Sequence, residues 1–238
     1  IRNPYNSEIK YYYPTSDLVT GPDIIFFWVA RMIISGNYLR QDIPFRNVYF
    51  TGLVRDKKGR KMSKQLGNSP DPEVLIKKYG ADGVRVGLLF CAPAGNDLLF
   101  DETLCNQGKN FSNKIWNAFR LIDGLKIDDS QQSKSHNEFA IKWFNENLNM
   151  KVLSINESFK NFKISEALMT LYKLFWDDFC SMYLEIIKPE YGKGVSKKLK
   201  HSTLTFLEKL LTLLHPFMPF ITSEIINQIV SNKNFNII

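Results

Sequence analysis

The residues best suited to chemistry are four consecutive positions, Lys61, Met62, Ser63 and Lys64, in a basic loop that begins at Arg55. Two lysine ammonium groups three residues apart on a flexible loop can converge on the oxygens of one phosphate group. Cations placed there favour nucleotidyl transfer, because negative charge builds on the departing pyrophosphate when an acid attacks the α-phosphate of ATP. The alternative interpretation is a solvated turn, which is the usual meaning of a Lys- and Arg-rich loop.

The segments before this loop predict the elements that carry it. Residues 24–34 are nearly all apolar and predict a buried helix, with Pro22 near its first position and Gly36 just past its end. Residues 48–54 predict a buried strand that leads into the loop.

A second helix is predicted directly after the loop. Asp71 is a good N-cap, Pro72 suits the first helical position, and Gly80 ends the helix. Helix, strand, loop and helix in this order predict an α/β unit with a parallel sheet, in which ligands bind at the carboxyl ends of the strands. The lysine loop would emerge at that edge.

From about residue 101 onward the pattern changes to long helices with no convincing strand. We expect helices at 101–125, 139–161, from a cap at Ser165 to Pro189, 195–214 and 221–231. The polar tract 128–137 predicts a connection between the first two. The predicted fold class is therefore α/β followed by an all-α, antiparallel helical bundle, with a change between residues 93 and 105.

Composition restricts the class of protein further. The net charge of +7 fits an anionic partner such as RNA or ATP without identifying one. No run of apolar residues is long enough to span a bilayer and no signal pattern begins at Ile1, so we expect a cytoplasmic protein without a membrane partner. Three scattered cysteines and three scattered histidines predict neither a disulfide framework nor a metal site.

Five motifs in this order resemble the class I aminoacyl-tRNA synthetases: Gly21-Pro22-Asp23, Lys61-Met62-Ser63-Lys64, Gly67-Asn68, Tyr79-Gly80-Ala81-Asp82 with Arg85, and the stretch Leu214 to Ile221 (LHPFMPFI). The lysine motif is shared by the whole class. The stretch Pro14 to Trp28 (PTSDLVTGPDIIFFW) is similar to the valine-specific enzymes in particular.

The resemblance implies a fold, substrates and partners. Residues 1–104 would form the C-terminal half of a Rossmann-like nucleotide-binding catalytic domain, and residues 105–238 a helical anticodon-binding domain. The implied activity is that of a valine–tRNA ligase, which activates valine with ATP and transfers it to tRNA(Val). Mg²⁺ would accompany ATP as part of the substrate, and the protein would be a monomer.

The resemblance also implies roles for single residues. Lys61 and Lys64 would be catalytic, holding the ATP phosphates and stabilising the pyrophosphate, with the Ser63 hydroxyl at the same site. Gly21 would let the backbone approach the ligand, and Asp23 would accept ribose hydroxyls of the adenylate. A first-turn carboxylate such as Asp23 could instead complement a helix dipole.

Ile24 and Trp28 lie four residues apart, on one face of the expected helix. The matching positions in the valine-specific enzymes line the amino-acid pocket, and we expect the same here. The alternative is that both side chains belong to the core.

Other polar residues have weaker assignments. Lys193, Lys197, Lys198 and Lys200 could contact the tRNA backbone, although a solvated helix face fits the same pattern. We interpret Asp82 and Arg85 as a structural i,i+3 pair. His215 has no partner in the sequence, and we interpret it as a helix C-cap or core residue.

Two departures from the family are visible. Gln65 stands where the family more often has Ser. No two histidines are close enough to form the family's His-x-Gly-His element, so we expect a fragment that is inactive by itself. The alternatives are a fragment of an isoleucyl or leucyl enzyme, and a non-catalytic tRNA-binding adaptor derived from a synthetase.

Overall fold

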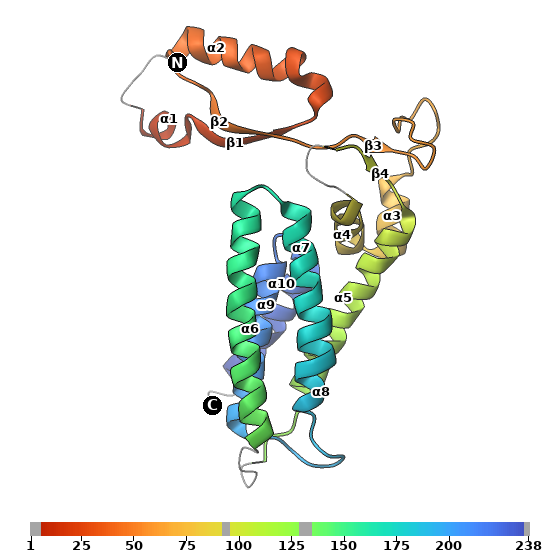
Figure 1. The fold of residues 1–238 in the computed structure, drawn as a ribbon, viewed down its shortest axis with the longest axis vertical. Helices are drawn as coiled ribbons and strands as arrows, with labels where there is room; N and C mark the ends of the chain where they lie inside the picture. Colours follow the sequence, from red (N-terminus) through yellow and green to blue (C-terminus); the bar gives the residue numbers. More distant parts are fainter. Residues whose placement is uncertain (1–5, 92–95, 129–134, 236–238) are drawn as a thin grey trace. The chain divides into compact units, whose positions relative to one another are not determined.

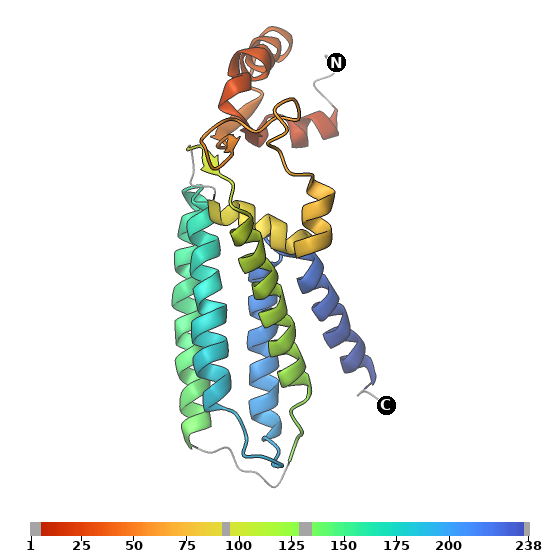
Figure 2. The ribbon, with the colours of Figure 1, turned by 90° about the vertical axis from the view of Figure 1, so that its right-hand side faces the viewer.

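The structure, a computed structural model, describes residues 6–91, 96–128 and 135–235 (Figures 1 and 2). These residues form two compact units. Unit 1 contains the described residues up to Met62 together with 96–100, and unit 2 contains 63–91 and the described residues from Asp101 onward.

Unit 1 is built on two pairs of parallel strands. The first pair is β1 (Thr15–Thr20) with β2 (Phe45–Phe50), in a register that places Thr15 opposite Phe45. The second pair is β3 (Val54–Arg55) with β4 (Leu98–Leu99). The short helix α1 (Ser7–Tyr12) precedes β1, and a helical crossover joins β1 to β2. The prediction of parallel strands in an α/β unit is confirmed.

The strand expected at 48–54 is two strands that have different partners. After Phe50 the Thr51 N–H still donates to the Thr20 carbonyl at 2.9 Å, whereas the Leu53 N–H donates to the Asp97 carboxylate at 3.0 Å. Gly52 lies where the chain changes from one partner strand to the other. Glycine is required there, because a Cβ would lie 1.8 Å from the Asn96 carbonyl oxygen. The chain thus leaves β1 and joins β4.

The crossover helix differs from the predicted helix at 24–34 in form and length. It begins as a 3₁₀ turn, η1 (Pro22–Ile24), continues as a π-helical segment, η2 (Ile25–Val29), and ends as α2 (Ala30–Arg40). Gly36 lies inside α2 rather than past its end. The helix stops where Gln41 adopts the left-handed conformation, with φ 56°.

The prediction that this helix is buried is wrong for the described residues. Phe26 is 83% exposed and Trp28 is 61% exposed, whereas Val29 and Gly36 are buried. A helix that is apolar on every face is usually buried by neighbouring elements on all sides. In unit 1 the strands β1 and β2 form only a short two-stranded sheet, which leaves part of the apolar helix surface exposed.

The described residues of unit 2 form helices joined by turns and loops, with one isolated parallel bridge between Ile127 and Val195. Its helices are α3 (Pro72–Tyr79), α4 (Ala81–Cys91), α5 (Glu102–Asp123), α6 (Ser135–Lys160), α7 (Ile164–Lys173), the π-helical η3 (Leu174–Tyr183), α8 (Leu184–Ile186), α9 (Lys197–Leu214) and α10 (Pro219–Phe235). Figure 2 shows the long helices running side by side as a bundle, which confirms the predicted all-α second part. The predicted domain boundary after residue 104 falls inside the first turn of α5 and stays a prediction.

Side-chain caps explain where α3, α5 and α9 begin. Asp71 accepts the Glu73 N–H at 2.9 Å, and Asp101 accepts the Thr103 N–H at 3.0 Å, as predicted for N-caps. The predicted cap at Ser165 is wrong. Lys163 occupies the N-cap position of α7, and the Ser165 hydroxyl donates instead to the Leu89 carbonyl at 2.8 Å. The predicted connection at 128–137 lies mostly outside the described residues.

The core of unit 2 is aromatic and continuous. Phe144 has the rings of Phe179, Tyr183 and Phe206 at centroid distances of 5.2, 5.1 and 5.0 Å, and all four side chains are buried. Trp116, Trp143 and Trp176 pack against it, partly buried.

Two glycines let α4 and α5 approach closely. A Cβ on Gly108 would lie 2.4 Å from the Gly83 carbonyl oxygen, and one on Gly87 would lie 2.7 Å from the Cys105 nitrogen. The two helix backbones are therefore in direct contact, with no room for a side chain between them.

Candidate nucleotide-binding site

The turn after β1 carries the predicted ligand-binding carboxylate. Gly21 precedes η1, and Asp23 lies in the single turn of η1. A Cβ on Gly21 would lie 2.6 Å from the Asp23 carboxylate oxygen Oδ1, so glycine makes room here for the side chain of Asp23 itself. The prediction that Gly21 accommodates a ligand remains a prediction.

The structure brings Asp23 and Lys61 together, although they lie 38 residues apart in the chain. The Lys61 ammonium lies 2.8 Å from Asp23 Oδ2. This hydrogen bond, more than the charge of Lys61, lowers the pKa of Asp23 below its ordinary value, and the small desolvation of the carboxyl group opposes it. Both side chains remain substantially exposed, so polar groups of a ligand could reach them.

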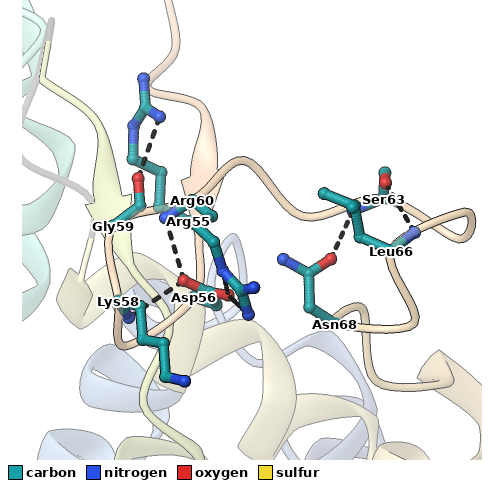
Figure 3. A network of polar contacts seen from close by, with 8 residues as sticks. All are labelled: Arg55, Asp56, Lys58, Gly59, Arg60, Ser63, Leu66 and Asn68. Carbon is teal, nitrogen blue, oxygen red and sulfur yellow. Dashed lines mark hydrogen bonds and ion pairs between the residues drawn. The ribbon is translucent and has the colours of Figure 1, made fainter.

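Residues 54–62 form a β-hairpin, and Lys61 lies near its end. Figure 3 shows the turn residues of this hairpin. The Met62 N–H donates to the Val54 carbonyl at 3.1 Å, and Arg55 and Lys61 form an antiparallel bridge. The turn closes through the Gly59 N–H, which donates to the Asp56 carbonyl at 2.8 Å, and Gly59 has φ 75°. Aspartate at the first turn position with glycine three residues later is a common turn signature.

The base of the 54–62 hairpin is tied to β4. Arg55 forms an ion pair with Asp97 and donates a second bond to the Gly59 carbonyl at 3.1 Å. The Arg55 hydrogen bond holds the pKa of Asp97 below its ordinary value. The strand pair β3–β4 therefore sets the position from which Lys61 projects.

Ser63 and Lys64 belong to unit 2 and begin a second local turn. The Ser63 N–H donates to Asn68 Oδ1 at 2.9 Å, and the Ser63 hydroxyl oxygen accepts the Leu66 N–H at 3.2 Å (Figure 3). The Lys64 carbonyl accepts the Gly67 N–H at 3.2 Å, and Gly67 has φ 61°. Lys64 itself is exposed. The contacts of Asp56, Asp97 and Asn68 are not visible in the sequence motifs.

Trp28 lines a cavity of about 540 Å³ in unit 1. The walls are mostly apolar and include Met32, Leu39 and Phe45, with Arg31 as a charged member. Ile24 is half-buried and is not one of the lining residues. The expected shared face assumed an α-helix, whereas Ile24 ends a 3₁₀ turn and Trp28 lies in a π-helical segment. The amino-acid pocket formed by both residues stays a prediction.

Asp82 and Arg85 are structural, as expected, but their partners differ from the predicted i,i+3 pair. The buried Asp82 carboxylate accepts the N–H groups of Phe220 at 3.3 Å and Ile221 at 2.7 Å, at the first turn of α10. Arg85 donates to the carbonyls of Pro216 at 2.9 Å and Phe217 at 3.0 Å. Two of the family-like motifs therefore bind each other.

His215 also has a structural place. It is the C-cap residue of α9, and its Nδ1 lies 2.9 Å from the Thr222 hydroxyl oxygen. This agrees with the interpretation of His215 as a helix C-cap.

The four lysines predicted to contact tRNA have different surroundings. Lys193 pairs with Glu190 at 2.6 Å, and Lys198 pairs with Glu138 at 3.1 Å. The Lys200 ammonium donates to the carbonyls of Asp123 and Leu125, so it caps the end of α5. Lys197 is exposed in the first turn of α9.

Within the described ranges, no group of three or more His, Cys, Asp and Glu side chains could hold a metal ion. Among the same residues, the helices are all too short or too polar to cross a bilayer.

Comparison with known proteins gives a match to each part of the chain. Residues 2–101 match the family described as tRNA synthetases class I (I, L, M and V), and residues 141–237 match the anticodon-binding domain of tRNA ligases. The structure is similar to methionyl-tRNA synthetase of Mycobacterium tuberculosis in complex with methionyl-adenylate, with a TM-score of 0.68 at 19% identity over 95% of this chain and 46% of that chain. LeuRS of Agrobacterium radiobacter K84, in a ternary complex with tRNA and LeuAMS, has a TM-score of 0.65 at 20% identity, over 89% of this chain and 27% of that chain.

The two sequence matches define the class: residues 2–101 belong to the class I tRNA synthetases, and residues 141–237 to the anticodon-binding domain of tRNA ligases. The relatives of the chain within that class are valine–tRNA ligases. The chain is 60% identical to that of Bacteroides thetaiotaomicron, over 96% of this chain and 26% of the relative, and 41% identical to that of Chlorobaculum tepidum, over 92% and 26%. The chain thus spans about a quarter of the length of these relatives.

Proposed function

We propose that this chain supplies the pyrophosphate-stabilising part and the anticodon-binding part of a valine–tRNA ligase. The parent enzyme would activate valine with ATP and then transfer the valyl group to tRNA(Val). The observation that supports the proposal is the contact between Lys61 and Asp23, because a cation suited to phosphate lies beside a carboxylate suited to ribose hydroxyls.

Each side chain has a distinct task in this proposal. The carboxylate of valine attacks the α-phosphorus of ATP, and the bond to the leaving pyrophosphate breaks. Lys61 and Lys64 stabilise the charge that builds on the pyrophosphate, so they contribute most in the transition state. Asp23 accepts the ribose hydroxyls. Mg²⁺ enters with ATP as part of the substrate, and Gly21 and Ser63 line the same site.

The amino-acid and tRNA contacts are proposed on weaker grounds. Trp28 would recognise the apolar side chain of valine from the wall of the unit 1 cavity, with Ile24 nearby in sequence. Lys193, Lys197 and Lys198 would contact tRNA phosphates, each without sequence information. Lys200 is the least suited of the four, because its ammonium is bonded to the end of α5. A monomeric, cytoplasmic enzyme stays our expectation.

The test is valine-dependent exchange between ATP and pyrophosphate, measured with the full-length enzyme that contains this chain and with the chain alone. We expect exchange in the full-length enzyme and little in the chain alone, because the chain lacks a His-x-Gly-His element. In the full-length enzyme, Lys64→Ala should slow adenylate formation with little change in tRNA affinity. An unchanged rate would remove Lys64 from the mechanism.

The second candidate is a tRNA-binding adaptor, which the net charge of +7 favours. An adaptor would bind tRNA but show no valine-dependent exchange in its full-length form. The same exchange assay therefore separates the two functions.

A further inference from the structure

We propose that Asp56 is a positioning residue for Lys61, and that it acts by fixing the turn of the 54–62 hairpin. The proposal rests on the proposed function of Lys61 in pyrophosphate departure. Asp56 itself would not touch the substrate.

The Asp56 carboxylate organises the whole turn (Figure 3). Its Oδ1 accepts two backbone N–H groups, from Lys58 at 3.0 Å and from Arg60 at 2.9 Å. Its Oδ2 accepts the Arg60 guanidinium, with Nε at 2.9 Å and Nη2 at 2.7 Å. The Asp56 side chain is only 13% exposed, whereas Arg60 is 55% exposed, so the carboxylate lies at the centre of the turn and the cation at its rim.

The charge of Asp56 adds a smaller contribution to the same turn. The turn and its flanks carry Arg55, Lys57, Lys58, Arg60 and Lys61. Like charges crowded into one short turn repel each other, and the carboxylate of Asp56 offsets that repulsion where the backbone bends most. It also engages the guanidinium of Arg60, the cation next to Lys61 in the chain.

The turn is connected to Lys61 through the backbone. The Asp56 N–H donates to the Arg60 carbonyl at 2.9 Å, and the next residue, Lys61, then pairs with Arg55 across the hairpin. The direction of the Lys61 side chain toward Asp23 therefore depends on the geometry of residues 56–60. A displacement of about 1 Å at a catalytic group can cost on the order of a hundredfold in rate.

The two kinds of bond that Asp56 makes can be separated by substitution. Asp56→Ala removes all of them. Asp56→Asn keeps an acceptor oxygen for the two backbone N–H groups but loses the ion pair with Arg60. Arg60→Ala loses the ion pair and keeps the backbone bonds. If the backbone bonds position Lys61, only Asp56→Ala should be severely impaired.

The experiment measures valine-dependent exchange by the full-length enzyme, with kcat and the KM for ATP determined separately. We expect Asp56→Ala to lower kcat by roughly tenfold to a hundredfold, with a smaller change in KM, because Lys61 acts mainly on the charge of the transition state. Asp56→Asn and Arg60→Ala should stay within about threefold of the unaltered enzyme, since an ion pair whose guanidinium is exposed to solvent contributes little. Asp42→Ala, which removes an exposed aspartate of unit 1 that also accepts a backbone N–H group, is the matched control and should leave kcat unchanged.

The decisive measurement is a double-mutant cycle. If Asp56 acts through Lys61, adding Asp56→Ala to Lys61→Ala should cause little further loss of kcat. Additive losses would overturn the proposal, and so would an Asp56→Ala enzyme with unchanged kcat. Should Asp56→Ala fail to fold, Gly59→Ala strains the same turn at a positive φ and is expected to reproduce the loss of kcat, while its unchanged kcat would overturn the proposal.

The failure of this inference can be told from the failure of the proposed function. An unaltered full-length enzyme without valine-dependent exchange would contradict the function itself. An active enzyme whose losses add in the double-mutant cycle would contradict only the role of Asp56.

Discussion

At the scale of single residues, Asp23 has an acid–base behaviour that depends on Lys61. We expect Lys61→Ala to raise the pKa of the Asp23 carboxyl group toward its ordinary value, because the hydrogen bond from Lys61 is the largest cause of the lowering. A pH titration of the Asp23 carboxyl carbon by NMR measures this directly. Asp97, whose pKa is lowered by Arg55, is the control and should not change. An unchanged Asp23 titration would contradict the contact.

Tyr183 gives a second prediction for a single residue. Burial raises its pKa to about 12, against the hydrogen bond with Thr203. The pKa of Tyr183 in the folded protein lies above its ordinary value of about 10. The neutral Tyr183 side chain therefore makes its full contribution to the unfolding free energy below pH 10, and this contribution is lost as the pH rises toward 12. Urea unfolding measures the unfolding free energy at pH 8 and at pH 11. The decrease between these two pH values should be smaller in Tyr183→Phe than in the unaltered protein.

The matching control for Tyr183 is Tyr191→Phe, which changes an exposed ring. At pH 8 we expect Tyr183→Phe to cost about 1 kcal/mol, the usual net value of one hydrogen bond. The cost is modest because the Thr203 hydroxyl still donates to the Leu199 carbonyl at 2.8 Å. If the unfolding free energy fell equally in both variants between pH 8 and pH 11, the pH dependence could not be assigned to Tyr183.

Some residues of the candidate site could be identified in the sequence, and others could not. Lys61, Lys64 and Asp23 stand in motifs, so their chemistry is visible from residue types and order. Asp56, Asp97 and Asn68 act on backbone groups or on distant residues, and only the folded chain shows those partners. The sequence does contain one signal for the role of Asp56, which is the β-turn signature of Asp56 followed three residues later by Gly59. The basic residues around it favour the interpretation of the whole segment as a solvated loop.

At the scale of elements, α4 holds the corner between α9 and α10 through Asp82 and Arg85. Asp82→Ala should lower the unfolding free energy by about 1–3 kcal/mol, because two N–H groups at the start of α10 lose a charged acceptor. Urea unfolding followed by circular dichroism measures the change. Asp82→Asn keeps one acceptor oxygen and should lose less, while Asp123→Ala, at the exposed end of α5, serves as a surface comparison. Equal stabilities of Asp82→Ala and the unaltered protein would contradict the role.

The helices were predictable to the extent that local signals define them. Asp71, Pro72 and Gly80 fix α3 by bonds within a few residues of each other, so the sequence was sufficient. Ser165 had the right type for a cap, but its hydroxyl bonds to Leu89, which is distant in the chain. The strand break at Gly52 depends on Asn96 and Asp97 for the same reason. Tertiary partners override local preference at both places.

At the scale of the whole molecule, the two units differ in how much apolar surface they bury. In the described part of unit 1 the buried apolar residues are Val29, Phe45, Leu98 and Phe100, whereas unit 2 has a continuous core. Native-state hydrogen exchange should therefore be faster for amides of β1 and β2 than for those of α6 and α9. Equal protection in β1 and α9 would contradict this expectation.

The glycine contact between α4 and α5 restricts how this part of the protein can move. Any sliding of one helix along the other would bring a side chain to the point where Gly83 meets Gly108, and there is no space for it. The two helices must then move together as one rigid body. Any rotation of this rigid body requires changes of backbone dihedral angles at its ends. Gly80, which has φ 78° and lies just before α4, can act as a hinge there.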